Sequence, residues 1–182
     1  YWTDEPEDPA VTIKGRPDVA RHIAGALLDR GFDIAYAYRP LHDEQLAHAF
    51  LNTVLFLDHR RTGFRWPMVP MPINCYGSKV IAAQGGWKPF AETLELDPPS
   101  PAPWRLMDLG GATARVLADS PWRVSIIASS SWSHAFLVDH QWRLRPDTAA
   151  DRALYEAMVA GDFDTWAKTT TDYGTVDKPH GY

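Results

Sequence analysis

The residue best suited to chemistry is a histidine at the end of an apolar run. Residues 124–134 read Val-Ser-Ile-Ile-Ala-Ser-Ser-Ser-Trp-Ser-His, so a β-branched stretch gives way to small hydroxyl residues and then to His134. In α/β proteins, ligands bind beyond the carboxyl ends of the strands. Imidazole is the side chain best suited to moving protons near neutral pH. The pattern therefore predicts a cleft in which His134 acts as an acid or a base.

A second apolar segment ends in a similar way. Residues 68–77 read Met-Val-Pro-Met-Pro-Ile-Asn-Cys-Tyr-Gly, so Asn74 follows an apolar run and precedes a turn. Polar residues that end two strands favour a shared cleft, because such ends line ligand sites in α/β sheets. The sequence therefore predicts that Asn74 and His134 lie in one cleft.

Other reactive residue types give weaker signals. None of the seven histidines belongs to a His-Glu-x-x-His pattern, so no self-contained metal site is visible. By position alone His48, within Leu-Ala-His-Ala-Phe, is a core histidine of an apolar helix. Cys75 has no base near it in sequence, and a lone cysteine is more often buried packing than a nucleophile. The serines do not form Gly-x-Ser-x-Gly, so a nucleophile elbow is unsupported.

The elements that must position these residues alternate along the chain. Apolar spacing and capping residues predict helices over 17–30, 43–58 and 147–160, the second half of 106–118, and the start of another over 164–168. Strands are expected at 11–13, 33–38, 68–73 and 122–128. Alternating strands and helices predict an α/β fold: one layered domain over residues 1–182, with a central, mostly β sheet flanked by helices. Residues 85–104 are predicted to form a proline-rich loop within that domain.

Three short elements together resemble the class III extradiol ring-cleavage dioxygenases, in particular catalytic subunits like that of protocatechuate 4,5-dioxygenase. Residues 129–134 are similar to the small-residue turn and Ser-His that end the family's central strand. His48-Ala49-Phe50 and residues 69–74 are similar to its earlier His-small-aromatic motif and its Pro-rich strand ending in Asn. The three elements occur in the family's order, and the likeness covers roughly residues 33–170, apart from the proline-rich loop.

This resemblance implies a specific chemistry. A non-haem Fe(II) would be held by two histidines and one carboxylate, leaving positions for an aromatic diol (a catechol) and O₂. His134 would be the leading acid–base residue, and His48 would steady charge on O₂ or substrate. The resemblance places Asn74, Ser131 and Ser133 at the substrate. It also implies a homo- or hetero-oligomer.

The chain departs from the family at the metal. The family takes two iron-binding histidines from an N-terminal section that has no counterpart here, and a glutamate from a later helix. Glu156 is the last glutamate of this chain, and residues 173–182 do not match. The iron ligands are therefore unassigned, and the expectation is that the chain is a central fragment of a longer catalytic domain.

Composition narrows the partners. The net charge is −5 without a block of like charges, which disfavours nucleic acid or an anionic membrane as a partner. No apolar run approaches the ~20 residues that span a bilayer. The single cysteine, Cys75, excludes an internal disulfide and fits a reducing cytoplasm.

Two other functions stay open. The first is a non-catalytic binding or interaction protein on the same fold, which lacks a complete metal site. The second is a different hydrolase or metal enzyme that pairs His134 with Asp139 or Asp162, and only general cleft logic supports it.

Overall fold

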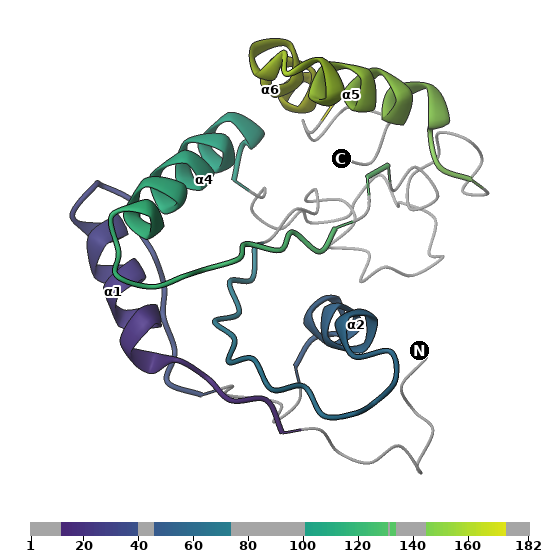
Figure 1. Ribbon diagram of the computed structural model, residues 1–182. Coiled ribbons are helices and arrows are strands. Elements are labelled where there is room, and N and C mark those ends of the chain that lie inside the picture. The colour runs from purple at the N-terminus through teal and green to yellow at the C-terminus, as the bar shows by residue number, and fades with distance from the viewer. Residues whose placement is uncertain (1–11, 40–45, 74–100, 131, 134–144, 174–182) are drawn as a thin grey trace, which may run out of the picture. The chain divides into compact units, whose positions relative to one another are not determined.

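The computed structural model describes residues 12–39, 46–73, 101–130, 132–133 and 145–173 (Figure 1). The chain divides into two compact units, which are described separately below. The first comprises Tyr1–Met71 and Val116–Ser130, and the second comprises Pro72–Arg115 and Ser131–Tyr182. The helices of the described residues are α1 (Pro17–Leu28), α2 (His48–Leu57), α4 (Pro103–Ala118), α5 (Thr148–Ala160) and α6 (Phe163–Tyr173).

Helix α1 follows the predicted apolar stripe. Val19, Ile23 and Leu27 recur at four-residue spacing and are all buried, with Leu27 fully so. Pro17 begins the helix, where its missing N–H is not needed. The helix ends two residues before the predicted Arg30, because a turn with Gly31 in the left-handed region (φ +81°) follows. The helix predicted over 17–30 is therefore confirmed with a slightly earlier end.

Helix α2 is apolar around most of its circumference, yet little of it is buried among the described residues. Val54 is 2% exposed, whereas Phe56 is 84% exposed. A loop stops the helix at Asp58, whose carboxylate accepts hydrogen bonds from the backbone N–H groups of Thr62 (2.9 Å) and Gly63 (2.8 Å). The helix predicted over 43–58 is confirmed for His48–Leu57, and its first residues, 43–45, lie outside the described part.

Helix α4 is longer than the sequence predicted. The expected helix occupied the second half of 106–118, whereas α4 begins at Pro103, within the loop predicted over 85–104. Ala112 and Val116, four residues apart, are buried. Thr113 is also buried, and its hydroxyl donates to the Leu109 carbonyl at 2.8 Å, which satisfies it inside the helix. Residues 85–100 lie outside the described part, so the rest of the proline-rich loop stays a prediction.

Helices α5 and α6 pack against each other in the second unit (Figure 1). Asp147 caps α5 by accepting from the Ala150 N–H at 3.1 Å. Gly161 ends α5 in the left-handed region (φ +69°), and Asp162 then caps α6 by accepting from the Thr165 N–H at 3.0 Å. Helix α6 confirms and extends the short helix predicted from 164.

The predicted α/β fold is wrong for the described residues, which are helical and contain no sheet. Their β pairing is one isolated parallel bridge between Gly15 and Met68. The run predicted as the central strand stays exposed, with Val124 at 44% and Ile126 at 65%. Strand propensity expresses packing against neighbouring strands, and apart from that bridge the predicted strands gain no such neighbours in the described part. Pro70 and Pro72 further deprive 68–73 of ladder donors.

Candidate functional site

The described part of the predicted Ser-His element is held at the N-terminus of α5. Ser133 is buried, at 4% exposure. Its backbone N–H donates to Asp151 Oδ1 at 2.9 Å, and its hydroxyl oxygen accepts from the Asp147 N–H at 2.8 Å. We call Ser133, Asp147 and Asp151 the α5 clamp. It joins residues 14 and 18 positions apart in sequence, and so it ties Ser133 to a helix that starts after it.

Asp147 makes the clamp continuous with the helix. It is 4% exposed, its carboxylate accepts from the Ala150 N–H, and its own N–H donates to Ser133. The first N–H groups of a helix have no partner within the helix and must find one elsewhere. One buried aspartate therefore satisfies a helix amide and also presents its backbone to the serine. Thus the same contacts that start α5 hold Ser133.

Aromatic and charged side chains lie next to the clamp along α5. The rings of Trp132 and Tyr155 lie 6.3 Å apart at an interplanar angle of 45°. A shallow hollow of about 380 Å³ borders the helix. It is lined by Thr148, Asp151, Arg152, Tyr155 and Glu156. The hollow is lined by the Tyr155 ring and by both acidic and basic side chains. One of them is Asp151, which accepts the hydrogen bond from the Ser133 N–H.

The predicted site residues are only partly within the described structure. Of the five, Ser133 and His48 are described, and they belong to different compact units. His48 is the first residue of α2 and is exposed, so it is not the core histidine that its apolar neighbours indicated. Asn74, Ser131 and His134 lie outside the described residues. The shared cleft therefore stays a prediction.

The described residues do not supply a ligand set for the Fe(II) that the resemblance implies. Nowhere in residues 12–39, 46–73, 101–130, 132–133 and 145–173 do three His, Cys, Asp or Glu side chains gather closely enough to hold a metal ion. A facial two-histidine, one-carboxylate site needs all three donors converging on one point. No step through iron is therefore derived from this part of the chain.

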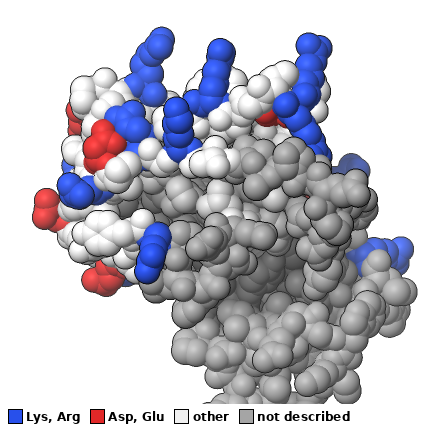
Figure 2. Space-filling view, turned by 90° about the horizontal axis from the view of Figure 1, so that it is seen from below, with Lys and Arg blue, Asp and Glu red and all other residues white. Residues whose placement is uncertain are grey.

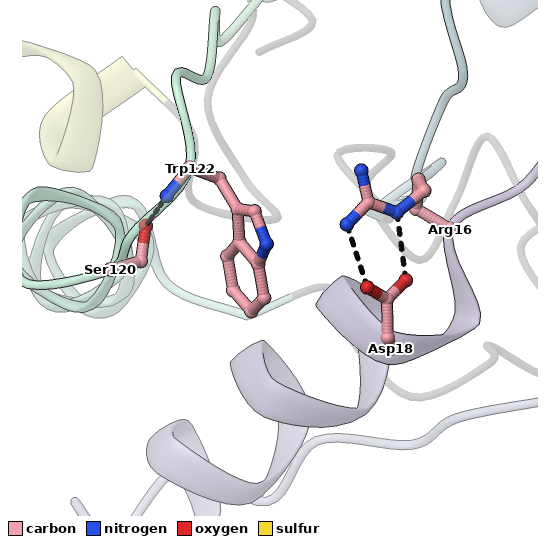
Figure 3. A network of polar contacts seen from close by, with 4 residues as sticks. All are labelled: Arg16, Asp18, Ser120 and Trp122. Atoms are coloured by element: carbon pink, nitrogen blue, oxygen red, sulfur yellow. Dashed lines mark hydrogen bonds and ion pairs between the residues drawn. The ribbon is translucent and has the colours of Figure 1, made fainter.

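A second polar network lies at the start of α1 in the first unit (Figure 3). The Arg16 guanidinium faces the Asp18 carboxylate with two hydrogen bonds of 2.8 and 2.6 Å. This pair holds the pKa of Asp18 well below its usual range, chiefly through the side-chain hydrogen bond from Arg16. The Trp122 ring lies 5.9 Å from the same guanidinium and meets the His22 ring edge-on at 5.2 Å. These contacts connect α1 to the chain that follows α4, which is a structural role.

Sequence reasoning missed Arg16, Trp122 and Asp151 as interacting residues. For Arg16 the sequence did hold a local signal, because an arginine two positions before an acidic residue of the first helical turn can pair with it. Asp147 and Asp151 also share one helix face at i, i+4 spacing, which indicated two acceptors at one helix start. Trp122 gave no local signal for its ring contacts, because the partners of the ring lie about a hundred residues earlier.

Charge is unevenly distributed between the units. The described part of the first unit carries nine Lys and Arg and five Asp, although the whole chain has a net charge of −5. Figure 2 shows Lys and Arg side chains projecting from the described surface on the face seen from below. Among the cations of the first unit, Arg16 pairs with Asp18, Arg30 donates to the Ala26 carbonyl at 2.8 Å, and Arg65 lies over the Trp66 ring at 5.0 Å. The described part of this unit is therefore basic within an acidic chain.

Comparison with known proteins adds no relative. No protein-family model, curated protein or solved structure matches the chain. Among the helices of the described residues, none has the length and apolar character needed to cross a membrane. The site must therefore be interpreted from the chain's own residues.

Proposed function

We propose that this chain belongs to the catalytic polypeptide of an O₂-dependent enzyme that opens the ring of a catechol-type substrate, similar to the class III extradiol dioxygenases. The proposal rests on three elements in the family's order: residues 48–50, 69–74 and 129–134. It does not rest on a sheet, since the described residues contain none. His134 is the acid–base residue, and Asn74 and Ser131 line the pocket.

The observation that carries the proposal is the way Ser133, which precedes His134 in the sequence, is held. The serine next to His134 is buried and hydrogen-bonded through both its N–H and its hydroxyl. A proton-transferring imidazole must stay within hydrogen-bond reach of its substrate, and this requires that its backbone be held. Tethering of this kind supports a catalytic role for the histidine, because a solvated loop histidine has no need of it.

The chemistry assigned to the chain's own residues is proton transfer. The imidazole of His134 takes a proton from one catechol hydroxyl, which raises electron density on the ring and prepares it for oxygen. The resulting imidazolium returns a proton to oxygen as the O–O bond breaks. His48, exposed at the start of α2, steadies negative charge that develops on oxygen or substrate.

The proposal also covers the cellular location and the oligomeric state of the protein. The single cysteine supports a cytoplasmic location, where thiols stay reduced. The resemblance supports a homo- or hetero-oligomer, and Trp104, which is 52% exposed on α4, is a candidate contact. Neither nucleic acid nor a membrane is proposed as a partner.

Oxygen consumption tests the proposal. The chain, and the complete product of the gene that encodes it, are loaded anaerobically with Fe(II) and given a panel of catechols. Uptake of O₂ together with a yellow ring-fission product is expected. Replacing His134 by Ala is expected to lower the rate about 100-fold or more, the usual contribution of a general acid or base. The control is His59→Ala, because His59 is an exposed histidine outside the three elements.

Two results contradict the proposal. One is the absence of O₂ uptake with every catechol tested on iron-loaded protein. The other is an equal rate in the His134→Ala and His59→Ala variants. Binding of a catechol without O₂ uptake would instead support the non-catalytic binding protein.

A further inference from the structure

The loop that follows α2 gathers exposed cations. Residues 59–66 read His-Arg-Arg-Thr-Gly-Phe-Arg-Trp, so three arginines and no acidic residue lie within eight positions. Arg60, Arg61 and Arg65 are all exposed. We call residues 58–66 the α2 loop, and it belongs entirely to the first unit. The α2 loop therefore carries a net positive charge in a chain whose net charge is −5.

One aspartate fixes the path of the backbone that carries two of these arginines. The Asp58 carboxylate accepts from the Thr62 N–H and hydroxyl, each at 2.9 Å, and from the Gly63 N–H at 2.8 Å. Arg60 and Arg61 lie between the acceptor and its donors in the sequence, so these hydrogen bonds close the backbone around them. The carboxylate therefore shapes the loop through backbone and hydroxyl donors and does not pair with the guanidinium groups.

Aromatic rings hold the third arginine. The Arg65 guanidinium lies over the Trp66 ring at 5.0 Å, and the Trp66 ring meets the Phe64 ring at 5.5 Å with an interplanar angle of 66°. Attraction between a cation and an aromatic ring restricts the guanidinium, but its planar fork of N–H groups can still donate to a carboxylate. An arginine held in this way has less conformational freedom to lose when it binds an anion.

We propose that the α2 loop is a docking surface for an acidic segment of a partner protein, with carboxylates bound by Arg60 and Arg65 and an apolar side chain placed against Trp66. This proposal does not depend on the proposed function. Trp and Arg are enriched at the energetic centres of protein interfaces, and here they are adjacent, with Trp66 51% exposed. Lys14 adds an exposed cation next to the loop, because its carbonyl accepts from the Met68 N–H at 2.8 Å.

Charge and stacking favour a short acidic segment over nucleic acid. Interactions between exposed charges are screened beyond about 8–10 Å in physiological salt, so a short segment is attracted mainly by the arginines of the loop. A nucleic acid strand extends further and meets the rest of a chain whose net charge is −5. Single strands also bind by stacking bases on open aromatic faces, whereas one face of Trp66 already contacts Arg65.

Fluorescence anisotropy with a labelled peptide tests the docking surface. The probe is the peptide Glu-Glu-Leu-Glu-Glu-Leu-Glu-Glu, titrated with the whole chain at about 50 mM NaCl, where surface charges are weakly screened. Arg65→Ala is expected to weaken binding about 5–10-fold, because a charged donor at the centre of the contact is lost. Trp66→Ala leaves the charge of the loop unchanged and is expected to weaken binding by a similar factor. The matched control is Arg30→Ala, which removes a cation of the same unit beyond the C-terminal end of α1 and is expected to change affinity less than about 2-fold.

A further variant separates a shaped surface from charge alone. Asp58→Ala removes an acid, so the loop becomes more positive, but it also removes the three hydrogen bonds that shape the loop. A surface that acts by charge alone would then bind the acidic peptide more tightly. The α2 loop is expected to bind it about 3-fold more weakly, because Arg60 is no longer held and its ordering opposes binding.

Several results would overturn the proposal. They are no binding of the peptide by the wild-type chain, tighter binding by Asp58→Ala, and an affinity in Arg65→Ala and Trp66→Ala equal to that of Arg30→Ala. Tighter binding of an oligothymidine of twelve nucleotides than of the peptide would identify nucleic acid as the partner instead. Circular dichroism at 222 nm checks that each variant keeps its helices. Should Trp66→Ala not fold, Arg65→Lys decides the question: it keeps the charge without the planar fork, and affinity equal to wild type would contradict the proposal.

Discussion

The two aspartate caps of the second unit allow one quantitative test of the energetics. Asp147 and Asp162 each accept from the backbone N–H three residues later, at 3.1 and 3.0 Å. They differ in surroundings: Asp147 and Ala150 are 4% and 3% exposed, whereas Asp162 is exposed. Replacing either by Ala removes the acceptor. The N–H of Ala150 or Thr165 then lacks its acceptor, and water is kept away only from the buried N–H of Ala150.

The expected losses follow from this difference. Removing an N-cap lowers the free energy of unfolding by about 1 kcal/mol, and leaving a buried donor without its acceptor costs about 1–3 kcal/mol. For Asp147→Ala we therefore expect a loss of about 2 kcal/mol, near the upper end of the cap range. In a protein of this size this lowers Tm by roughly 4–8 °C. Asp162→Ala is expected to lose less, because water replaces the lost acceptor.

Urea unfolding followed by circular dichroism at 222 nm measures both losses at pH 7. Amide hydrogen exchange at Ala150 and Thr165 reports the same loss locally, which matters if the two units unfold separately. Asp147→Asn keeps an accepting oxygen and serves as the control, with stability expected close to wild type. Equal losses at the two caps, or a larger loss at Asp162, would refute the argument from burial.

Three further predictions concern the helices and one loop. Leu27→Ala is expected to destabilise by about 2–5 kcal/mol, because Leu27 is fully buried; Leu28→Ala, at a neighbouring exposed position, should stay within about 0.5 kcal/mol, and equal urea midpoints would contradict this. Gly161→Ala is expected to lower the free energy of unfolding by about 1 kcal/mol, and with it Tm, because an alanine at positive φ is strained. Gly25→Ala is expected to raise the free energy of unfolding by about 1 kcal/mol, because alanine favours the helix and a Cβ has open space at both glycines. Hydrogen bonds, above all from the Thr62 backbone N–H, hold the pKa of Asp58 below its ordinary value of 3.8. Its stabilisation is therefore complete above that pH and is lost as the pH falls through the lower folded-state pKa. The urea midpoint of wild type should thus fall more between pH 6 and pH 3 than that of Asp58→Asn. Equal decreases in the two proteins would contradict a stabilising role for the Asp58 carboxylate in this loop.

Local signals account for the helices that the sequence predicted well. In α1 the four-residue spacing of Val19, Ile23 and Leu27 identified the buried face, and all three are buried. In α5 the cap Asp147 and the terminator Gly161 marked both ends. These features act within one or two helical turns, so they can be recognised without knowledge of the rest of the chain.

The sheet was mispredicted because strands have no comparable local test. An alternating or β-branched run such as residues 122–128 indicates a surface that suits a sheet, but pairing requires another strand at the right register. In the described residues that requirement is met only at the Gly15–Met68 bridge. The shared cleft was inferred from strand ends as well, and it stays a prediction because Asn74 and His134 lie outside the described residues.

By itself the sequence determined that the five described helices form, where α5 begins and ends, which face of α1 is apolar, and that residues 124–134 end in the one histidine presented by small polar residues. Only the tertiary structure decided what holds Ser133. Ser133 meets an aspartate 18 residues later, and the pairing depends on α5 turning Asp151 toward it. The physical reason is range: capping and periodicity are satisfied between near neighbours, whereas a buried serine takes its partners from whichever segment the chain brings beside it.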